Sequence, residues 1–404
     1  MTAQESSDGS PYWRRNLWVS LVGSFTTLVA MTLLLPFLPI YVEQLGVKDQ
    51  AAIVQWSGVA YGSTFLTAGF AAPLWGRLGD RYGRKLMLIR ASLGMTVAIS
   101  LMGMAHDVWQ LLALRLLTGL LGGYSSGATV LVATETPKAR TGWALGMLAS
   151  GILAGSLAGP LVGGVLPPII GIRRIFWVAG GVIFLSFLAT TFLIKERPKP
   201  PGSPKRKPPP GWAAVPDKRP LIAMLVTGML LMVANMSIEP IITVYVAELV
   251  PDPSRVTLIS GVVMSVAALG SILAAPRLGK LADRVGPWNV IVGALVACGV
   301  LLIPQAFVTS AWQLVGLRFL MGLALGGLLP CIASVIRHSA PSEMAGTLLG
   351  YSTSAQYAGQ VVGPAVGGFI GGHFGMRFVF LGTCVLMLLG AGFNAVSNSR
   401  AKLR

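Results

Sequence analysis

The chain carries one pattern twice, with about 203 residues between the two copies. Residues 73–83 recur as 276–286, and residues 155–164 recur as 359–368. Two shorter segments recur at the same offset of 203 or 204. Two apolar halves of equal length and like order are typical of transporters built from paired helical bundles around a shared cavity. The repeat therefore predicts two bundles of the same design.

Most of the sequence is too apolar to fold in water. Apolar residues make up 54% of the 404 residues and charged residues only 11%, so lipid must be the solvent for most of the chain. We predict an all-α membrane protein with twelve transmembrane helices in two pseudo-symmetric six-helix bundles. The predicted spans lie at roughly 16–42, 53–75, 86–105, 108–133, 142–166, 174–194, 220–247, 256–276, 288–308, 311–335, 345–370 and 376–397.

The net charge of +17 is explained by the orientation of the chain in a membrane. If both termini are cytoplasmic, 24 of the 31 Lys and Arg residues fall on the cytoplasmic side, as the positive-inside rule requires. We therefore expect no nucleic-acid partner and a multi-pass protein of the cytoplasmic (inner) membrane. The expected partners are the lipid bilayer, a small-molecule substrate and protons, and we expect the protein to function as a monomer.

The two halves are separated by a stretch rich in Pro, Lys and Arg at residues 195–219. Proline removes a backbone donor and blocks helical geometry, so this stretch should be an extended cytoplasmic linker. It would join an N-terminal bundle over 1–194 to a C-terminal bundle over 220–404. The basic residues serve either the topology alone or, in addition, a contact with anionic lipids.

The segment from Gly76 to Lys85 has the composition of a tight, charged turn between two apolar helices. Its glycines permit close approach and unusual backbone angles, and Asp80 suits an ion pair or a helix N-terminal cap. The segment resembles the signature cytoplasmic loop of the major facilitator superfamily. That resemblance implies that a latch closes the two halves on the cytoplasmic face during alternating access. The latch residues are Gly76, Asp80, Arg81, Gly83, Arg84, Asp283 and Arg284.

Span 5 carries a stripe of glycines around one proline. A spacing of four places them on one helical face, where a second helix can press close. This pattern resembles the antiporter motif of the same superfamily, which implies a role in export. The motif residues are Gly155, Gly159, Pro160, Gly163 and Gly164.

Arg115 lies in an apolar stretch of span 4, where a charge costs at least ~2.5 kcal/mol unless it faces protein, water or a partner. Together with Gly119 it resembles the span-4 motif of the drug–proton antiporter branch, in which the Arg is assigned to proton coupling. Arg318 is its counterpart in the second half. Alternatively, either Arg anchors helix packing through backbone carbonyls.

Glu239 is the acidic residue that the sequence places well inside a span. A carboxyl group withdrawn from water binds a proton more readily, which a proton-coupling group requires. Its counterpart in the first half is Leu35, so the acid is no repeat-wide structural device. The coupling candidates are Glu239, Arg115, Asp80 and Glu135, the last at the inner end of span 4. Pro36 and Pro240 should bend spans 1 and 7 at equivalent places.

Aromatic and amide side chains within the spans suit a cavity for large amphipathic ligands. The cavity candidates are Asn235, Tyr124, Gln356, Tyr357 and Trp56. The sequence contains no phosphate-binding loop and no hydrolase motif, so we expect a transporter and not an enzyme, with no cofactor and no metal.

The sequence is identified as a member of the drug–proton antiporter branch of the major facilitator superfamily, of the bacterial multidrug exporter type. The resemblance implies a secondary active transporter that exports amphipathic drugs or related small molecules by proton antiport and alternating access. Two alternatives stay open: an exporter of a specific metabolite or sugar, and a membrane protein that does not transport.

Overall fold

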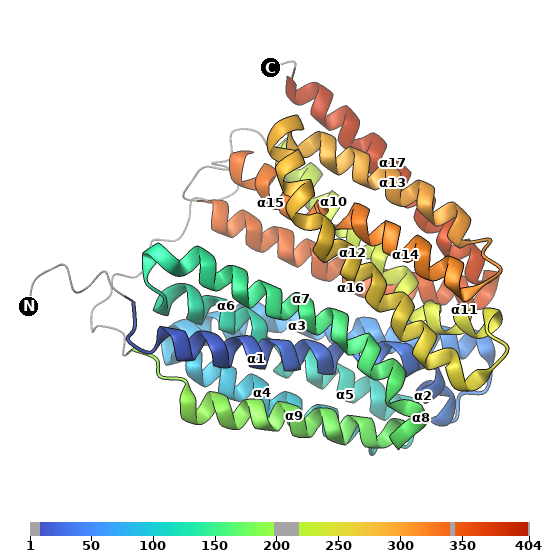
Figure 1. The fold of residues 1–404 in the computed structure, drawn as a ribbon, viewed down its shortest axis with the longest axis horizontal. Coiled ribbons are helices and arrows are strands. Elements are labelled where there is room, and N and C mark those ends of the chain that lie inside the picture. The colour runs from blue at the N-terminus through green and yellow to red at the C-terminus, as the bar shows by residue number, and fades with distance from the viewer. Residues whose placement is uncertain (1–8, 198–217, 340–343, 403–404) are drawn as a thin grey trace, which may run out of the picture. The chain divides into compact units, whose positions relative to one another are not determined.

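The structure is a computed structural model, and it describes residues 9–197, 218–339 and 344–402. Throughout these residues the chain forms helices joined by short turns, and none of them lies in a strand (Figure 1). This agrees with the all-α prediction. The contacts divide the chain into two compact units. The predicted linker lies for the most part at 198–217, outside the described residues.

The first unit comprises residues 1–37 and 66–204. Its helix α1 (Trp13–Thr32) packs on α7 (Thr141–Val165) and on α9 (Ile172–Leu193), and α9 also packs on α4 (Arg84–Met102). Figure 1 shows these helices running lengthwise beside one another. The unit also contains the end of α3 (Gln50–Tyr82), α5 (Val108–Leu121), α6 (Tyr124–Glu135), the short α8 (Pro167–Ile170), and the 3-10 turns at Leu35–Phe37 and Lys138–Arg140.

The second unit comprises residues 38–65 and 205–404. Three helix pairs form its frame: α10 (Arg219–Ile238) with α16 (Ala345–Phe374), α12 (Val256–Val285) with α14 (Ala311–Leu325), and α13 (Pro287–Gln305) with α17 (Met376–Lys402). The unit also contains α2 (Leu38–Gln44), the start of α3, the 3-10 turn η4 (Glu239–Ile241), α11 (Ile242–Leu249), the turn at Pro253–Arg255, and α15 (Leu328–Ser339).

The start of α3 groups with the second unit because small residues let it approach α16 closely. A Cβ added at Gly62 would lie 3.0 Å from the Val361 carbonyl oxygen, and one at Gly372 would lie 2.7 Å from the Ala51 carbonyl oxygen. The two packing units therefore differ from the predicted bundles 1–194 and 220–404, because residues 38–65 group with the second unit. The division into these two bundles stays a prediction.

Ten helical segments among the described residues are long and apolar enough to cross a membrane. The predicted spans 53–75 and 345–370 form α3 and α16, which have 33 and 30 residues but are less apolar. Ten of the twelve predicted spans therefore have both the length and the apolarity to cross a membrane, and the count of twelve stays a prediction. Glycines of both helices face the backbone of another helix, Gly62 that of α16 and Gly359 that of α10.

The predicted bends near Pro36 and Pro240 are confirmed. Span 1 breaks into α1, a 3-10 turn and α2, and span 7 breaks at the equivalent place into α10, η4 and α11. The sequence did not predict a second pair of breaks, in spans 4 and 10. There α5 ends before Gly122-Gly123, and α14 ends before Gly326-Gly327. Gly123 adopts the left-handed region with φ of 99°, which glycine tolerates without strain.

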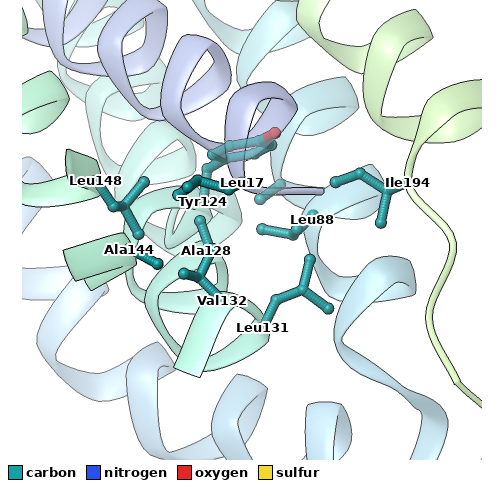
Figure 2. Close-up of a cluster of buried hydrophobic side chains, with 10 residues drawn as sticks. Leu17, Leu88, Tyr124, Ala128, Leu131, Val132, Ala144, Leu148 and Ile194 are labelled. Atoms are coloured by element: carbon teal, nitrogen blue, oxygen red, sulfur yellow. The ribbon is translucent and has the colours of Figure 1, made fainter. Parts of the chain in front are cut away.

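Tyr124 lies in the hydrophobic core of the first unit (Figure 2). It is 1% exposed, and its hydroxyl shares a hydrogen bond of 2.7 Å with the Thr190 hydroxyl. The ring also fills the space beside Gly23, where an added Cβ would overlap it. The prediction that Tyr124 lines a substrate cavity is therefore wrong for this structure. The surrounding core residues are Leu17, Leu88, Ala128, Leu131, Val132, Ala144, Leu148 and Ile194.

Tyr124→Phe should lower the stability of the purified protein without changing transport. The substitution keeps the ring but leaves the Thr190 hydroxyl without its partner, at a cost of about 1 kcal/mol. Thermal unfolding in detergent would measure the loss, with Thr190→Val as the matched variant. Because both remove the same bond, the double variant should be little worse than either single one. A large loss of transport in a stably folded Tyr124→Phe protein would contradict the core assignment.

Candidate functional site

The Asp80 motif ends a helix, and only one residue makes the turn. Helix α3 continues to Tyr82, Gly83 turns the chain with φ of 99°, and α4 begins at Arg84. The prediction of a longer turn over 76–85 is therefore wrong. Asp80 forms the predicted ion pair with Arg84, which lies four residues later, across the turn at Gly83. Asp80 is largely exposed in this pair while Arg84 is mostly buried.

Glu196 caps α4, a role that the sequence analysis considered only for Asp80. Its two carboxylate oxygens each accept a backbone N–H bond of 2.8 Å, one from Arg84 and one from Lys85. A carboxylate is favourable here because the first amides of a helix lack internal partners and carry partial positive charge. A Cβ at Gly83 would lie 2.9 Å from the Glu196 Oε2 atom, so this glycine is needed for space as well as for its backbone angle.

The other predicted latch residues described here make fewer contacts than Asp80, Gly83 and Arg84. Gly76 lies inside α3, and among the described residues no atom comes within 4 Å of an added Cβ, so the predicted close approach is not seen there. Asp283 and Arg284 occupy the last turn of α12, and Gly286 turns the chain with φ of 88°. Within the described ranges Asp283 forms no ion pair, since Pro287-Trp288 replace the basic pair of the first copy.

Glu135 ends α6 and joins three parts of the first unit. It is 7% exposed, its Oε1 accepts a bond of 3.3 Å from the Arg197 amide, and its carbonyl oxygen accepts one of 2.8 Å from the Ser10 amide. Nearby, the Asn16 side chain donates to the Lys195 carbonyl at 2.8 Å and accepts from the Lys195 amide at 3.1 Å. Together these bonds hold the end of α6, the segment after α9 and the start of the described chain against one another.

The glycine stripe of α7 packs on the backbone of α1, as predicted. An added Cβ would lie 2.7 Å from the Phe25 carbonyl oxygen at Gly155, 3.0 Å from the Val29 carbonyl oxygen at Gly159, and 2.7 Å from the Leu33 carbonyl carbon at Gly163. Gly164 and Pro160 are buried, and α7 continues through the proline. The second copy is similar: a Cβ at Gly363 would lie 2.7 Å from the Val233 carbonyl oxygen.

Polar side chains satisfy the carbonyls released where α5 ends. The Arg90 guanidinium donates to the Leu121 carbonyl at 2.9 Å and to the Gly122 carbonyl at 3.2 Å. Trp75 Nε1 donates to the Leu120 carbonyl at 2.7 Å, and the Arg90 guanidinium carbon lies 3.6 Å from the centre of the Trp75 ring. The sequence analysis missed both residues. Two features of the sequence could have revealed them: Arg90 is a charge inside the predicted span 86–105, and Trp75 directly precedes the Asp80 motif.

Arg115 and Arg318 are both buried, at 3% and 1% exposure. Arg115 lies in α5 and Arg318 at the equivalent place in α14. Glu239 begins the turn η4, between α10 and α11, and is half-buried. The charges of Glu239 and Arg318 act on each other, although the described part of the chain contains no ion pair between them.

The other cavity candidates lie in the second unit. Asn235 is in α10, Gln356 and Tyr357 are in α16, and Trp56 is in the first part of α3; all four are half-buried. Gln356 Nε2 donates to the Ser352 hydroxyl at 3.3 Å, and α10 and α16 form the most extensive helix pair of the unit. The described residues contain no cluster of His, Cys, Asp and Glu that could hold a metal ion.

A family model described as Major Facilitator Superfamily matches residues 20–304 and, in a second match, 225–397. The chain belongs to the major facilitator superfamily. The two overlapping matches reflect the internal repeat, because each half of a facilitator resembles the other.

Close relatives of this facilitator are named multidrug resistance protein MdtG. The protein from Enterobacter lignolyticus (strain SCF1) is 42% identical over 399 residues, covering 98% of this chain and 95% of its own. The protein from Salmonella typhimurium (strain LT2) is 42% identical over 401 residues, covering 98% of both chains. Among solved structures, a bacterial homologue of the human lysosomal transporter Spinster has a TM-score of 0.74 at 15% identity, over 96% of this chain and 97% of that one.

The comparisons agree with the fold described above. This facilitator is a multi-pass α-helical membrane protein, and the motifs identified in its sequence lie where helices of one unit meet or end. The turn of the Asp80 motif is held by the Asp80–Arg84 ion pair and the Glu196 cap, while the glycine motif joins α7 to α1.

Gly163→Ala should lower the stability and the transport rate of this facilitator more than Gly146→Ala does. Both glycines lie in α7, but a Cβ at Gly163 would overlap the Leu33 carbonyl, whereas no described atom lies within 4 Å of one at Gly146. Overpacking of this kind costs roughly 1–3 kcal/mol. Thermal unfolding and transport should both fall for Gly163→Ala, and Gly146→Ala should match the parent protein. Equal behaviour of the two variants would remove the packing role of the stripe.

Proposed function

We propose that this facilitator exports amphipathic drugs or related small molecules by proton antiport and alternating access. The observation that carries the proposal is the 42% identity, along 98% of the chain, to proteins named multidrug resistance protein MdtG. In this proposal the protein lies in the cytoplasmic (inner) membrane with both termini in the cytoplasm, because its basic residues partition to that side.

Glu239 is the proposed proton-coupling group. It lies at the break of span 7, where broken helices of secondary transporters place their binding groups. It is half-buried, and the charge of the buried Arg318 acts on it. Asp80 and Arg84 are the proposed latch, and buried Arg115 is a second residue proposed to assist coupling. The bonds of Glu135 to the Arg197 amide and the N-terminal segment favour an anchoring role for that carboxylate over coupling.

Transport by the purified protein in liposomes tests the proposed function. An acidic lumen should drive accumulation of lipophilic cationic dyes in vesicles whose transporters face inside-out, and a protonophore should abolish the accumulation. A panel of dyes, antibiotics and small metabolites separates a multidrug exporter from an exporter of one metabolite. No accumulation of any dye or antibiotic, with or without the gradient, would contradict drug export.

Glu239→Gln should uncouple transport without stopping it. The amide imitates a carboxyl group that never releases its proton, so substrate exchange across a membrane without a pH gradient should continue while uphill efflux is lost. Glu248→Gln is the matched control, since Glu248 lies in the same span at the exposed end of α11. It should remain coupled. Normal uphill efflux by Glu239→Gln would mean that the proton binds elsewhere.

A further inference from the structure

The second unit buries a guanidinium group that lacks most of its hydrogen-bond partners. Arg318, in α14, is 1% exposed, and its Nη1 contacts the Met321 Sδ atom at 4.0 Å. Its Nε and Nη2 atoms have no hydrogen-bond partner among the described residues. A buried cation without acceptors is strongly destabilising, so these donors need an acceptor that this arrangement of the described residues does not give them.

A buried side-chain amide beside the same sulfur atom has an acceptor that lacks a donor. Gln305, at the end of α13, is fully buried, and its Nε2 donates to the Leu301 carbonyl at 3.0 Å and contacts Met321 Sδ at 3.6 Å. Its Oε1 acceptor has no partner in the described part of the chain. The Tyr245 hydroxyl donates to the backbone carbonyl of Gln305 at 2.9 Å and so ties α11, which follows Glu239, to the end of α13.

Comparison of the two copies of the repeat indicates that Arg318, Gln305 and Glu239 serve more than helix packing. At the offset of 203 or 204, Arg318 corresponds to Arg115, whereas Gln305 corresponds to Met102 and Glu239 to Leu35. The arginine is therefore common to both halves, but the acid and the amide occur in the second half alone. A device needed only to hold a bundle together would be expected in both copies.

We propose that Arg318 is the positioning residue for Glu239, pairing with the ionised carboxylate and turning to Gln305 Oε1 when the carboxyl group is protonated. The proposal rests on Glu239 as the coupling group. The described residues hold neither a Glu239–Arg318 ion pair nor a bond from Arg318 to Gln305 Oε1, so the structure shows neither of the two paired arrangements. On ionisation, the proton leaves for the water to which the site is then open, and the guanidinium donors Nε and Nη2 bind the carboxylate. On protonation, the pair opens and Gln305 accepts them.

Arg318 is the charged group that acts on Glu239. The helices packed directly on η4 are α10, α11 and α16. The other titratable or charged groups on these three helices are Arg219, Tyr245, Glu248, Tyr351, Tyr357 and His373. Glu248 and Arg377 act on each other at the end of α11, and neither replaces Arg318 as the partner of Glu239.

The deciding measurement is the ratio of uphill, pH-driven efflux to counterflow, which is substrate exchange without a pH gradient, in the same liposomes. Arg318→Gln should keep counterflow but lower uphill efflux at least about tenfold, because a carboxyl group without its cation ionises less readily. Arg318→Lys keeps the charge and should restore much of the ratio. Gln305→Met, which installs the residue of the first copy, should also lower the ratio, because the protonated state loses the acceptor for Arg318.

Thr227→Val is the control for a merely structural role. It breaks the buried bond of 2.8 Å from Asn394 to the Thr227 hydroxyl, in the same unit but away from the cluster, and should leave the ratio unchanged. If Arg318→Gln fails to fold, Arg318→Lys and Gln305→Met decide the outcome through the same ratio. A coupled Glu239→Gln protein would overturn the proposed coupling site itself. If Glu239→Gln is uncoupled but the Arg318 and Gln305 variants stay fully coupled, Glu239 remains the coupling group. That result would overturn only the proposed movement of Arg318 between Glu239 and Gln305.

Discussion

Backbone groups released inside an apolar helical bundle must find partners within the protein, and the helix ends of the first unit show how they do so. Where α5 stops at Gly122-Gly123, Arg90 and Trp75 bind the freed carbonyls. Where α4 starts, Glu196 binds the freed amides. Lipid cannot supply such partners, and each orphaned group would cost several kcal/mol. In these two places of the first unit, a side chain distant in sequence reaches the gap.

Close backbone approach is the second constraint. The glycine stripes of α7 and α16 let α1 and α10 lie against them with carbonyl oxygens near 2.7 Å from the position a Cβ would take. In a membrane, where apolar burial gives little drive for helices to associate, such contact supplies the attraction. In both of these pairs the partner helix also breaks, at Leu35–Phe37 and at Glu239–Ile241. Each unit thus supports its broken helix against a continuous glycine-rich one.

The two copies share their scaffold and differ in their chemistry. Glycine stripes, helix breaks and a buried arginine occur in both units, whereas Glu239 and Gln305 occur in the second alone. Likewise the Asp80–Arg84 ion pair belongs to the first copy, because proline and tryptophan replace the basic pair in the second. We infer that departures from the repeat mark where the proposed proton-coupling and latch functions reside, since the features common to both copies already satisfy the needs of folding.

The sequence by itself determined the features that depend on local composition and spacing. The repeat, the apolar segments, the glycine face of span 5 and the proline breaks of spans 1 and 7 each follow from residues close together in the chain. The tertiary structure alone decided which distant residue completes a local feature. Glu196 lies 112 positions from the amide of Arg84, and the Thr190 hydroxyl lies 66 positions from Tyr124, which it holds in the core. A sequence pattern records that a helix begins or that a ring is present, but long-range packing decides which partner satisfies it.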